Sequence, residues 1–186
     1  MPADKPGTLA IQEFGRLPVM SNGRFQPLDS LARNSLLQLR EKQTANLEPW
    51  KEWYDKPKII PAIEWLATVM MNPTEADAWP IFRIDHPEVI GLLKLPQKDR
   101  AMQRDGKHYS WNDIQPALGV MDAERKRIGG SEEAKGIPTD LRTPFERAVM
   151  KLHEGRVRYI RLQTRLRPQD ARKWRQGLTA YQTRFP

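Results

Sequence analysis

Cysteine is absent from this chain of 186 residues. A chain without cysteine cannot form a disulfide framework, a thiolate zinc site, an iron–sulfur cluster or a cysteine nucleophile. Histidine is scarce as well, and the three that occur, His86, His108 and His153, are isolated from one another. A site built from several histidines is therefore not expected, and we predict that the chain holds no metal.

Long apolar runs are also absent. The longest runs from Trp65 to Met71 with Thr68 inside it, which is far short of the ~20 residues that a membrane-spanning helix needs. No apolar segment follows Met1, so no signal peptide is visible. We expect neither a membrane span nor a signal peptide within this sequence. Hydrophobic residues still make up 39% of the chain, which is enough to form a core.

The sequence carries few of the patterns that enzymes use. It contains no glycine-rich phosphate loop, no H-E-x-x-H helix and no G-x-S-x-G turn. Asp85, His86 and Glu88 could form a general base with an orienting carboxylate, but an Asp before His-Pro is more often part of a helix start. For His108 and His153 we favour ordinary surface positions. We predict that the chain is not an enzyme by itself and binds no cofactor of its own.

Positive charge is in excess, but it is unevenly placed. The net charge is +8 and the isoelectric point about 9.9, yet basic and acidic residues cancel over the first hundred residues. A basic tail is typical of contact with nucleic acid, an anionic membrane surface or an acidic partner, and equally of a solvated helix face. The residues that we predict to form a basic surface are Arg156, Arg158, Arg161, Arg165, Arg172, Lys173 and Arg175.

The spacing of apolar and turn residues predicts a mainly α chain, a small helical domain with a short N-terminal β-hairpin and one further short strand. Asn22-Gly23 marks the hairpin turn within residues 17–27, because both residues tolerate positive φ. The 3.6-residue period and the turn signals place the remaining elements. Helices are expected at 28–42, 61–72, 87–93, 110–128, from 145 onward and at 169–183, and the strand at 79–84.

Three local features extend this prediction. The helix at 61–72 is apolar nearly all round, so it is either buried centrally or docks a partner. Arg156 falls inside the apolar stripe of the helix from 145 and therefore needs a carboxylate or a path to solvent. Trp50 and Trp53 are compatible with an exposed patch, although we favour packing in the core.

The most specific pattern is the stretch from Phe14 to Arg33, which reads FGRLPVMSNGRFQPLDSLAR. It resembles a segment in the large extracytoplasmic regions of system II cytochrome c biogenesis proteins of the fused CcsB/CcsA (ResB/ResC) type. Residues 79–93 and 109–114 are similar to two further segments of those regions, and the order is preserved over residues 14–115. The matching residues of the first segment are Asn22, Gly23, Arg24, Pro27, Leu28, Asp29, Leu31, Ala32 and Arg33.

This resemblance implies a role in moving haem to the outer face of the membrane and attaching it to apocytochrome c. It places the chain on the extracytoplasmic, periplasmic side of the bacterial inner membrane. The chain departs from the family because it has no membrane span and no tryptophan-rich WWD motif, and we transfer a haem-ligating role to none of its histidines. The expected function is that of a non-catalytic scaffolding or docking module of a cytochrome c synthase. Its expected partners are the membrane-embedded part of that synthase and apocytochrome c, with haem reaching it only through the parent system.

The candidate binding motif consists of Asn22, Gly23, Arg24, Pro27, Asp29 and Arg33. Most of it can be explained as a fold-defining turn, since Gly23 supplies positive φ, Pro27 opens a helix and an Asp pairs with an Arg four residues later. Arg24 is not needed by the turn, and its fork of donors suits a haem propionate or another carboxylate. The alternative function is a basic helical nucleic-acid-binding protein, which no recognisable nucleic-acid motif supports.

These features suggest an organisation in four parts. Residues 1–13 are expected to be a flexible lead-in, and residues 14–128 the family-like module. Residues 129–140 read as a polar loop. Residues 141–186 are expected to be a basic helical region packed on the module.

Overall fold

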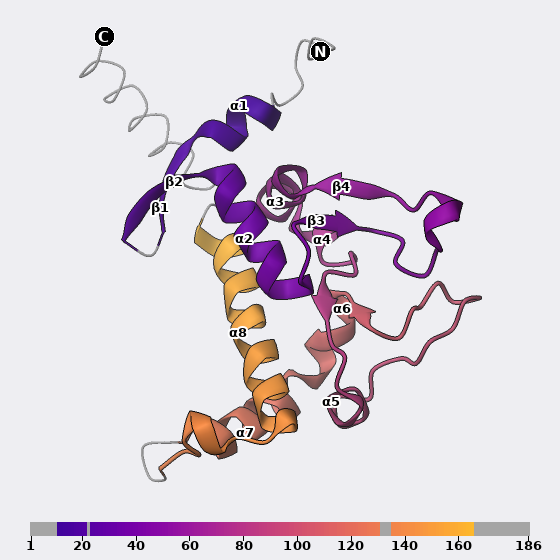
Figure 1. Ribbon diagram of the computed structural model, residues 1–186, viewed down its shortest axis with the longest axis vertical. Coiled ribbons are helices and arrows are strands. Elements are labelled where there is room, and N and C mark those ends of the chain that lie inside the picture. The colour runs from indigo at the N-terminus through magenta and orange to yellow at the C-terminus, as the bar shows by residue number, and fades with distance from the viewer. Residues whose placement is uncertain (1–10, 22, 131–134, 166–186) are drawn as a thin grey trace.

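The computed structural model describes residues 11–21, 23–130 and 135–165. The chain is mainly helical with short antiparallel strand pairs, including an N-terminal hairpin, which confirms the predicted fold class (Figure 1). Its α-helices are α1 (Ile11–Arg16), α2 (Leu28–Arg40), α3 (Ala62–Met71), α4 (Pro73–Ala76), α5 (Pro87–Leu92), α6 (Trp111–Ile114), α7 (Leu118–Gly129) and α8 (Pro144–Arg165). The strands are β1 (Pro18–Ser21), β2 (Arg24–Pro27), β3 (Thr44–Asn46), β4 (Ile59–Pro61), β5 (Phe82–Arg83) and β6 (His108–Tyr109), and the 3-10 helices are η1 (Trp53–Asp55), η2 (Gln115–Ala117) and η3 (Thr139–Leu141).

The hairpin and the helix after it form as their sequence predicts. Strands β1 and β2 pair in the register Ser21 opposite Arg24, and Gly23 adopts φ +73° in the turn. Pro27 precedes the first turn of α2 with φ −61° and ψ 148°, a conformation that proline favours because its ring fixes φ. One face of α2 carries Leu28 and other apolar residues into the core.

Helix α3 is the centre of the core. It is buried on nearly every side, and α1, α2, α4 and α8 pack around it. This arrangement explains why its sequence is apolar nearly all round, since a helix surrounded by others has no face to give to water. Trp65, which is fully buried, is among the largest side chains of the core.

The structure contains more strand pairing than the sequence predicted. The expected strand at 79–84 forms as β5 and pairs with β6, and a further antiparallel pair joins β3 to β4. The segment between β3 and β4 includes η1. Each pair is only two or three residues long, so the pairs tie loops to the helical core and do not build a sheet of their own.

The helix predicted at 110–128 is divided into α6, η2 and α7. Pro116 lies within η2 and has no backbone N–H to donate, so the α-helical hydrogen-bond ladder is interrupted there. The start of this region matches its prediction, because Ser110 and Asp113 form a reciprocal capping box on α6.

Helix α8 runs from α7 towards the hairpin and lies against α2, α3 and α5 (Figure 1). Tyr159, in the C-terminal half of α8, is fully buried and donates a hydrogen bond of 2.9 Å to Oδ1 of Asp77. Its ring packs edge-on to Phe82 at 5.3 Å and against Trp111 at 5.7 Å. Burial raises the pKa of Tyr159 well above its usual range, so this side chain stays neutral and fastens α8 to the core.

The expected lead-in and the expected helix at 169–183 lie largely or wholly outside the described residues. Within the described residues, none of the helices combines the length and the apolar character that crossing a bilayer requires.

Candidate functional site

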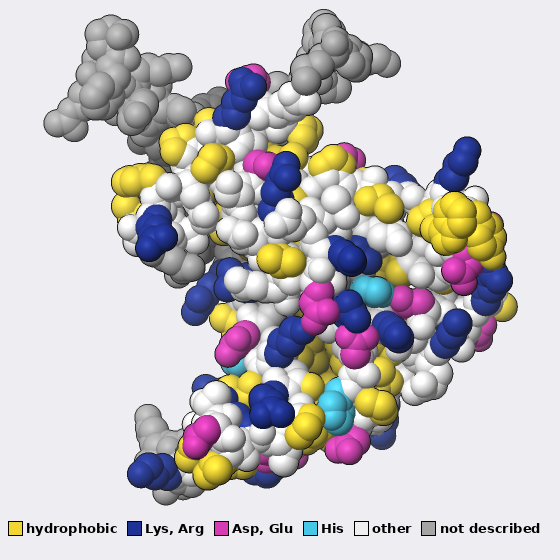
Figure 2. Space-filling view, viewed as in Figure 1, with side chains coloured by type: hydrophobic (Ala, Val, Ile, Leu, Met, Phe, Trp, Pro, Cys, Tyr) yellow, Lys and Arg dark blue, Asp and Glu magenta, His cyan; other side chains and the backbone are white. Residues whose placement is uncertain are grey.

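The hairpin projects from the helical core and exposes apolar side chains. Met20 and Phe25 face each other across the two strands, and Phe25 is 76% exposed. Hydrophobic side chains gather over this part of the surface in Figure 2. Arg24, beside Phe25, is exposed. A cross-strand apolar pair contributes little to folding when water covers it, so this pair is available for contact with a partner.

The rest of the predicted motif is used by the fold. Asp29 accepts a hydrogen bond of 2.8 Å from Nε of Arg33, as expected for a pair four residues apart on a helix. Gly23 needs its left-handed conformation for the turn, and open space surrounds the position where a Cβ would lie. Asn22 lies outside the described residues. Of the motif residues that the structure describes, Arg24 is therefore the one with no evident structural task.

The structure brings this hairpin next to the basic end of α8. A groove of about 620 Å³ separates the two. Apolar side chains from both elements and from α2 line it, and two arginines lie on its α8 side. The lining residues are Val19, Met20, Ser21, Leu31, His153, Glu154, Val157, Arg158, Arg161 and Leu162.

The electrostatics of the groove favour an anionic ligand. Burial lowers the pKa of Arg158, and the charge of Arg161 lowers it further, while Glu154 acts in the opposite direction. Neither arginine has an ion-pair partner among the described residues. Burial and the nearby Arg156 also lower the pKa of His153, which keeps its ring neutral at neutral pH. The groove therefore carries two guanidinium groups against one carboxylate.

The predicted basic surface is only partly present as a surface. Arg156 is 13% exposed and donates from Nη2 to Oδ1 of Asp122 at 2.8 Å, so it belongs to the interface of α7 and α8. The prediction that Arg156 belongs to the basic surface is therefore wrong. Its position inside an apolar stripe explains why, since a charge there needs a carboxylate, which Asp122 supplies. Arg165 ends α8, and the structure does not describe its side chain. Arg172, Lys173 and Arg175 lie outside the described residues.

A second cavity of about 310 Å³ lies between α2, β5 and α8. At this cavity Arg83 contacts both Asp85 and Glu41, at 2.7 and 3.0 Å, and Glu41 also pairs with Lys151. Asp85 is therefore engaged by Arg83 and does not orient His86. The ring of His86 packs edge-on to Phe145 at 5.8 Å, and its buried Nδ1 has no hydrogen-bond partner among the residues that the structure describes. His86 occupies the N-cap position of α5 without making a side-chain cap.

The remaining histidine, His108, makes a partly buried hydrogen bond with Asp105. Its Nδ1 contacts Oδ2 of Asp105, whose other oxygen accepts from the backbone N–H groups of Lys107 and His108. Burial by itself would raise the pKa of Asp105, but these hydrogen bonds outweigh it and lower the pKa to about 2. Across the described residues, the structure contains no group of three or more His, Asp or Glu that could hold a metal ion.

The sequence did not identify the groove itself. Its two walls lie more than a hundred residues apart in the chain. The sequence identified the hairpin motif and the basic side of α8 as two separate features and gave no indication that they lie side by side. The apolar floor gave no signal, because Leu31, Val157 and Leu162 also fit an ordinary helix core. Comparison with protein-family models, with curated proteins and with solved structures finds no match to this chain.

Proposed function

We propose that this chain is a non-catalytic docking module of a cytochrome c maturation system, on the extracytoplasmic side of the bacterial inner membrane. The observation that carries the proposal is the resemblance of residues 14–115, in conserved order, to the extracytoplasmic regions of system II biogenesis proteins. Haem enters this proposal only as the cargo of the parent system, and we assign no haem ligand in this chain.

The character of the hairpin surface supports docking. Arg24, Phe25 and Met20 offer a cation and two apolar groups on a short, well-defined hairpin. Exposed aromatic and arginine side chains are the types that contribute most to protein–protein binding. The groove beside the hairpin adds Arg158 and Arg161 over an apolar floor. A complementary partner therefore presents an acidic segment with apolar residues between its charges.

We propose that this partner is the membrane-embedded part of the same synthase. Apocytochrome c is the alternative partner that the tests can identify. The two differ in when they bind. A synthase segment remains docked in resting membranes, whereas apocytochrome c binds only while cytochrome c is being made. A crosslinker placed at Val157 in the groove distinguishes them by the mass of the adduct, and an adduct with neither contradicts the groove as the docking site.

The first experiment is Arg24→Ala in the complete gene. We expect the yield of holocytochrome c to fall while the melting temperature of the purified chain stays the same, because Arg24 is exposed and its side chain makes no hydrogen bond or ion pair within the part of the chain that the structure describes. Arg16→Ala is the matched control, since Arg16 is also exposed and its one ion-pair partner among the described residues is the exposed Glu13. An unchanged yield would remove Arg24 from any functional role, and a lower melting temperature would assign it to the fold.

The second experiment reverses charge in the groove. Arg161→Glu is expected to weaken co-purification with the membrane-embedded synthase about tenfold or more, because a like charge then faces the acidic segment. Lys126→Glu, at an exposed position of α7, is the control and changes the net charge by the same amount. Equal effects of the two variants would mean that only net charge matters and would contradict a specific site.

A further inference from the structure

Two aromatic side chains are exposed to solvent at the end of the segment between β3 and β4. Trp53 and Tyr54 on η1 are 85% and 61% exposed, and their rings pack edge-to-face at 5.9 Å. The hydrophobic patch over η1 is visible in Figure 2 at the side of the molecule away from the hairpin. We call these two residues the aromatic tip. The sequence favoured core packing for Trp53, so its exposure is a correction.

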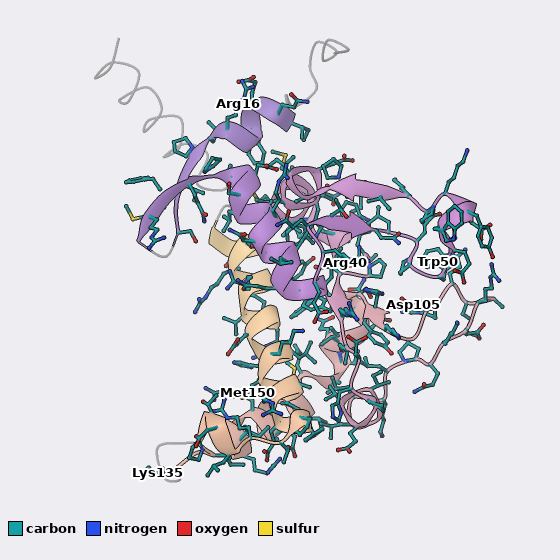
Figure 3. The ribbon with its side chains drawn as sticks, viewed as in Figure 1. Arg16, Arg40, Trp50, Asp105, Lys135 and Met150 are labelled. Carbon is teal, nitrogen blue, oxygen red and sulfur yellow. The ribbon has the colours of Figure 1, made fainter. Side chains whose placement is uncertain are left out.

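Hydrogen bonds at the base of the segment between β3 and β4 fix the position of the aromatic tip. Glu48 accepts hydrogen bonds of 2.8 Å from Nζ of Lys51 and from the backbone N–H of Lys58. The backbone N–H of Leu47 donates to the carbonyl of Lys58 at 2.8 Å, which closes the base of the segment. Trp50, labelled in Figure 3, is half-buried below the tip. Because these contacts fix the segment, binding through the tip requires little further ordering.

The charges around the tip are arranged in favour of an anionic surface. Glu48 is engaged with Lys51, and Asp55 contacts Nη2 of Arg100 at 3.4 Å. The exposed charges that remain at the tip are Lys56, Lys58 and one carboxylate, Glu52. The contact with Arg100 also joins the neighbouring loop at 96–107, on which Met102 is 74% exposed.

We propose that the aromatic tip inserts into the interface of a phospholipid bilayer, with Lys56 and Lys58 against anionic headgroups. Tryptophan and tyrosine prefer this interface because each has an apolar body and a polar end, and lysine reaches the headgroups with its ammonium while its stem stays apolar.

The shape of the tip favours lipid over a protein partner. A stable protein interface covers about 800 Å² on each side, whereas this surface is a protruding end formed by a few residues (Figure 1). The inference goes beyond the proposed docking function and does not depend on it, since the hairpin lies on the opposite side of the molecule.

The test is flotation of the purified chain with vesicles of phosphatidylcholine containing phosphatidylglycerol. We expect the unmodified chain to bind these vesicles. We expect the double variant Trp53→Ala/Tyr54→Ala to bind them with an affinity at least about tenfold lower. Leu141→Ala is the control, because it removes an exposed apolar side chain from η3, outside both the tip and the hairpin. Failure of the unmodified chain to float, or equal binding by the double variant, would overturn the proposal. Binding that survives in the double variant and falls steeply with salt would assign membrane contact to the basic residues elsewhere.

A second measurement tests insertion itself. Brominated lipid quenches tryptophan that enters the acyl region, so it should quench part of the fluorescence of the bound chain. Trp53→Phe keeps an aromatic ring and is expected to float normally while losing that quenching. Unchanged quenching in Trp53→Phe would show that another tryptophan enters the bilayer and would overturn insertion through the tip. Flotation and quenching are measured on the purified chain without the synthase, so failure here is separable from failure of the docking function.

Discussion

Asp105 is a carboxylate whose environment holds it strongly in the charged form. It contacts the ring of His108, accepts two backbone hydrogen bonds and lies close to the buried guanidinium of Arg40 (Figure 3). Arg40 in turn donates to the carbonyls of Thr44 and Asn46 at 3.4 and 3.3 Å. A small charged centre thus connects the end of α2 to the loop before β6.

The acid stability of the protein should depend on Asp105. Its pKa falls from an ordinary 3.8 to about 2 on folding. The folded state therefore gains stability from this group above pH ~4, and loses it as the pH falls towards 2. We expect Asp105→Asn to cost about 1–2 kcal/mol at neutral pH after allowance for solvent screening, and to flatten the acid limb of the stability curve. Urea unfolding at a series of pH values measures both effects.

The control for this prediction is Asp140→Asn. Asp140 is exposed on η3 and has no ion-pair partner among the described residues. Its replacement should leave both the neutral and the acid stability nearly unchanged. If Asp105→Asn and Asp140→Asn have the same acid profile, the hydrogen bonds to Asp105 do not control the titration.

Contacts between near neighbours in sequence could be predicted, and contacts between distant ones could not. The pair of Asp29 with Arg33 follows from a fixed spacing on a helix and is confirmed, and the cap of Ser110 with Asp113 is likewise a contact between near neighbours. The pairing of Asp105 with His108 is also local, but it needs a loop geometry that no spacing rule specifies. Arg40 is buried by partners that reach it only through the tertiary fold.

At the scale of helices, the joint between α7 and α8 contains a charge pair of structural importance. Arg156 contacts Asp122 at 2.8 Å, and its Nε is buried without a hydrogen-bond partner. Hydrogen bonding to Arg156 lowers the pKa of Asp122. Removal of the carboxylate leaves a guanidinium that is largely withdrawn from water and has lost its anion.

We predict that Asp122→Ala lowers the free energy of unfolding by about 1–2 kcal/mol, because a hydrogen bond to a charged group is lost and its partner remains buried. Asp29→Ala, which removes the exposed pair with Arg33, should cost less than about 1 kcal/mol. A double-mutant cycle with Arg156→Met isolates the coupling energy. Equal costs for the two pairs would show that burial of Arg156 has no energetic consequence.

Elements whose ends carry a strong local signal agree with their predicted bounds. The hairpin turn, the start of α2 after Pro27 and the end of α3 before Pro73 are examples, because proline and glycine limit the backbone directly. The pairing of β3 with β4 was missed, since its strands are three residues long and twelve residues separate them. The break at Pro116 was not predicted, because residues 110–128 were interpreted as one continuous helix.

At the scale of the whole molecule, two tryptophans have opposite environments. Trp65 is fully buried in α3 at the centre of the core, whereas Trp53 projects into water. We expect Trp65→Ala to cost about 3–5 kcal/mol, because it leaves a large cavity among packed helices. Trp53→Ala should change the free energy of unfolding by less than about 0.5 kcal/mol. Urea unfolding followed by far-ultraviolet circular dichroism compares them, and a large cost for Trp53→Ala would mean that the aromatic tip serves the fold.

The exposed surface is the least predictable part of the molecule. Periodicity identifies which residues of a helix turn inward, and the nearly all-round apolar sequence of α3 left central burial and partner docking open, of which the structure shows burial. It does not determine which helix end faces which hairpin, so the groove beside Arg158 was not foreseen. Nor does it separate a buried tryptophan in a loop from an exposed one, because loop residues have no repeating face.

The position of α8 in the chain has a consequence for synthesis. The apolar faces of α2 and α3 are made early, but Tyr159 and Leu162, which complete the same core, follow much later. At ordinary rates of translation, roughly 5–20 s separate Met71 from Arg165. The nascent chain therefore carries an uncovered apolar helix through that interval, and this core is completed only after α8 has emerged.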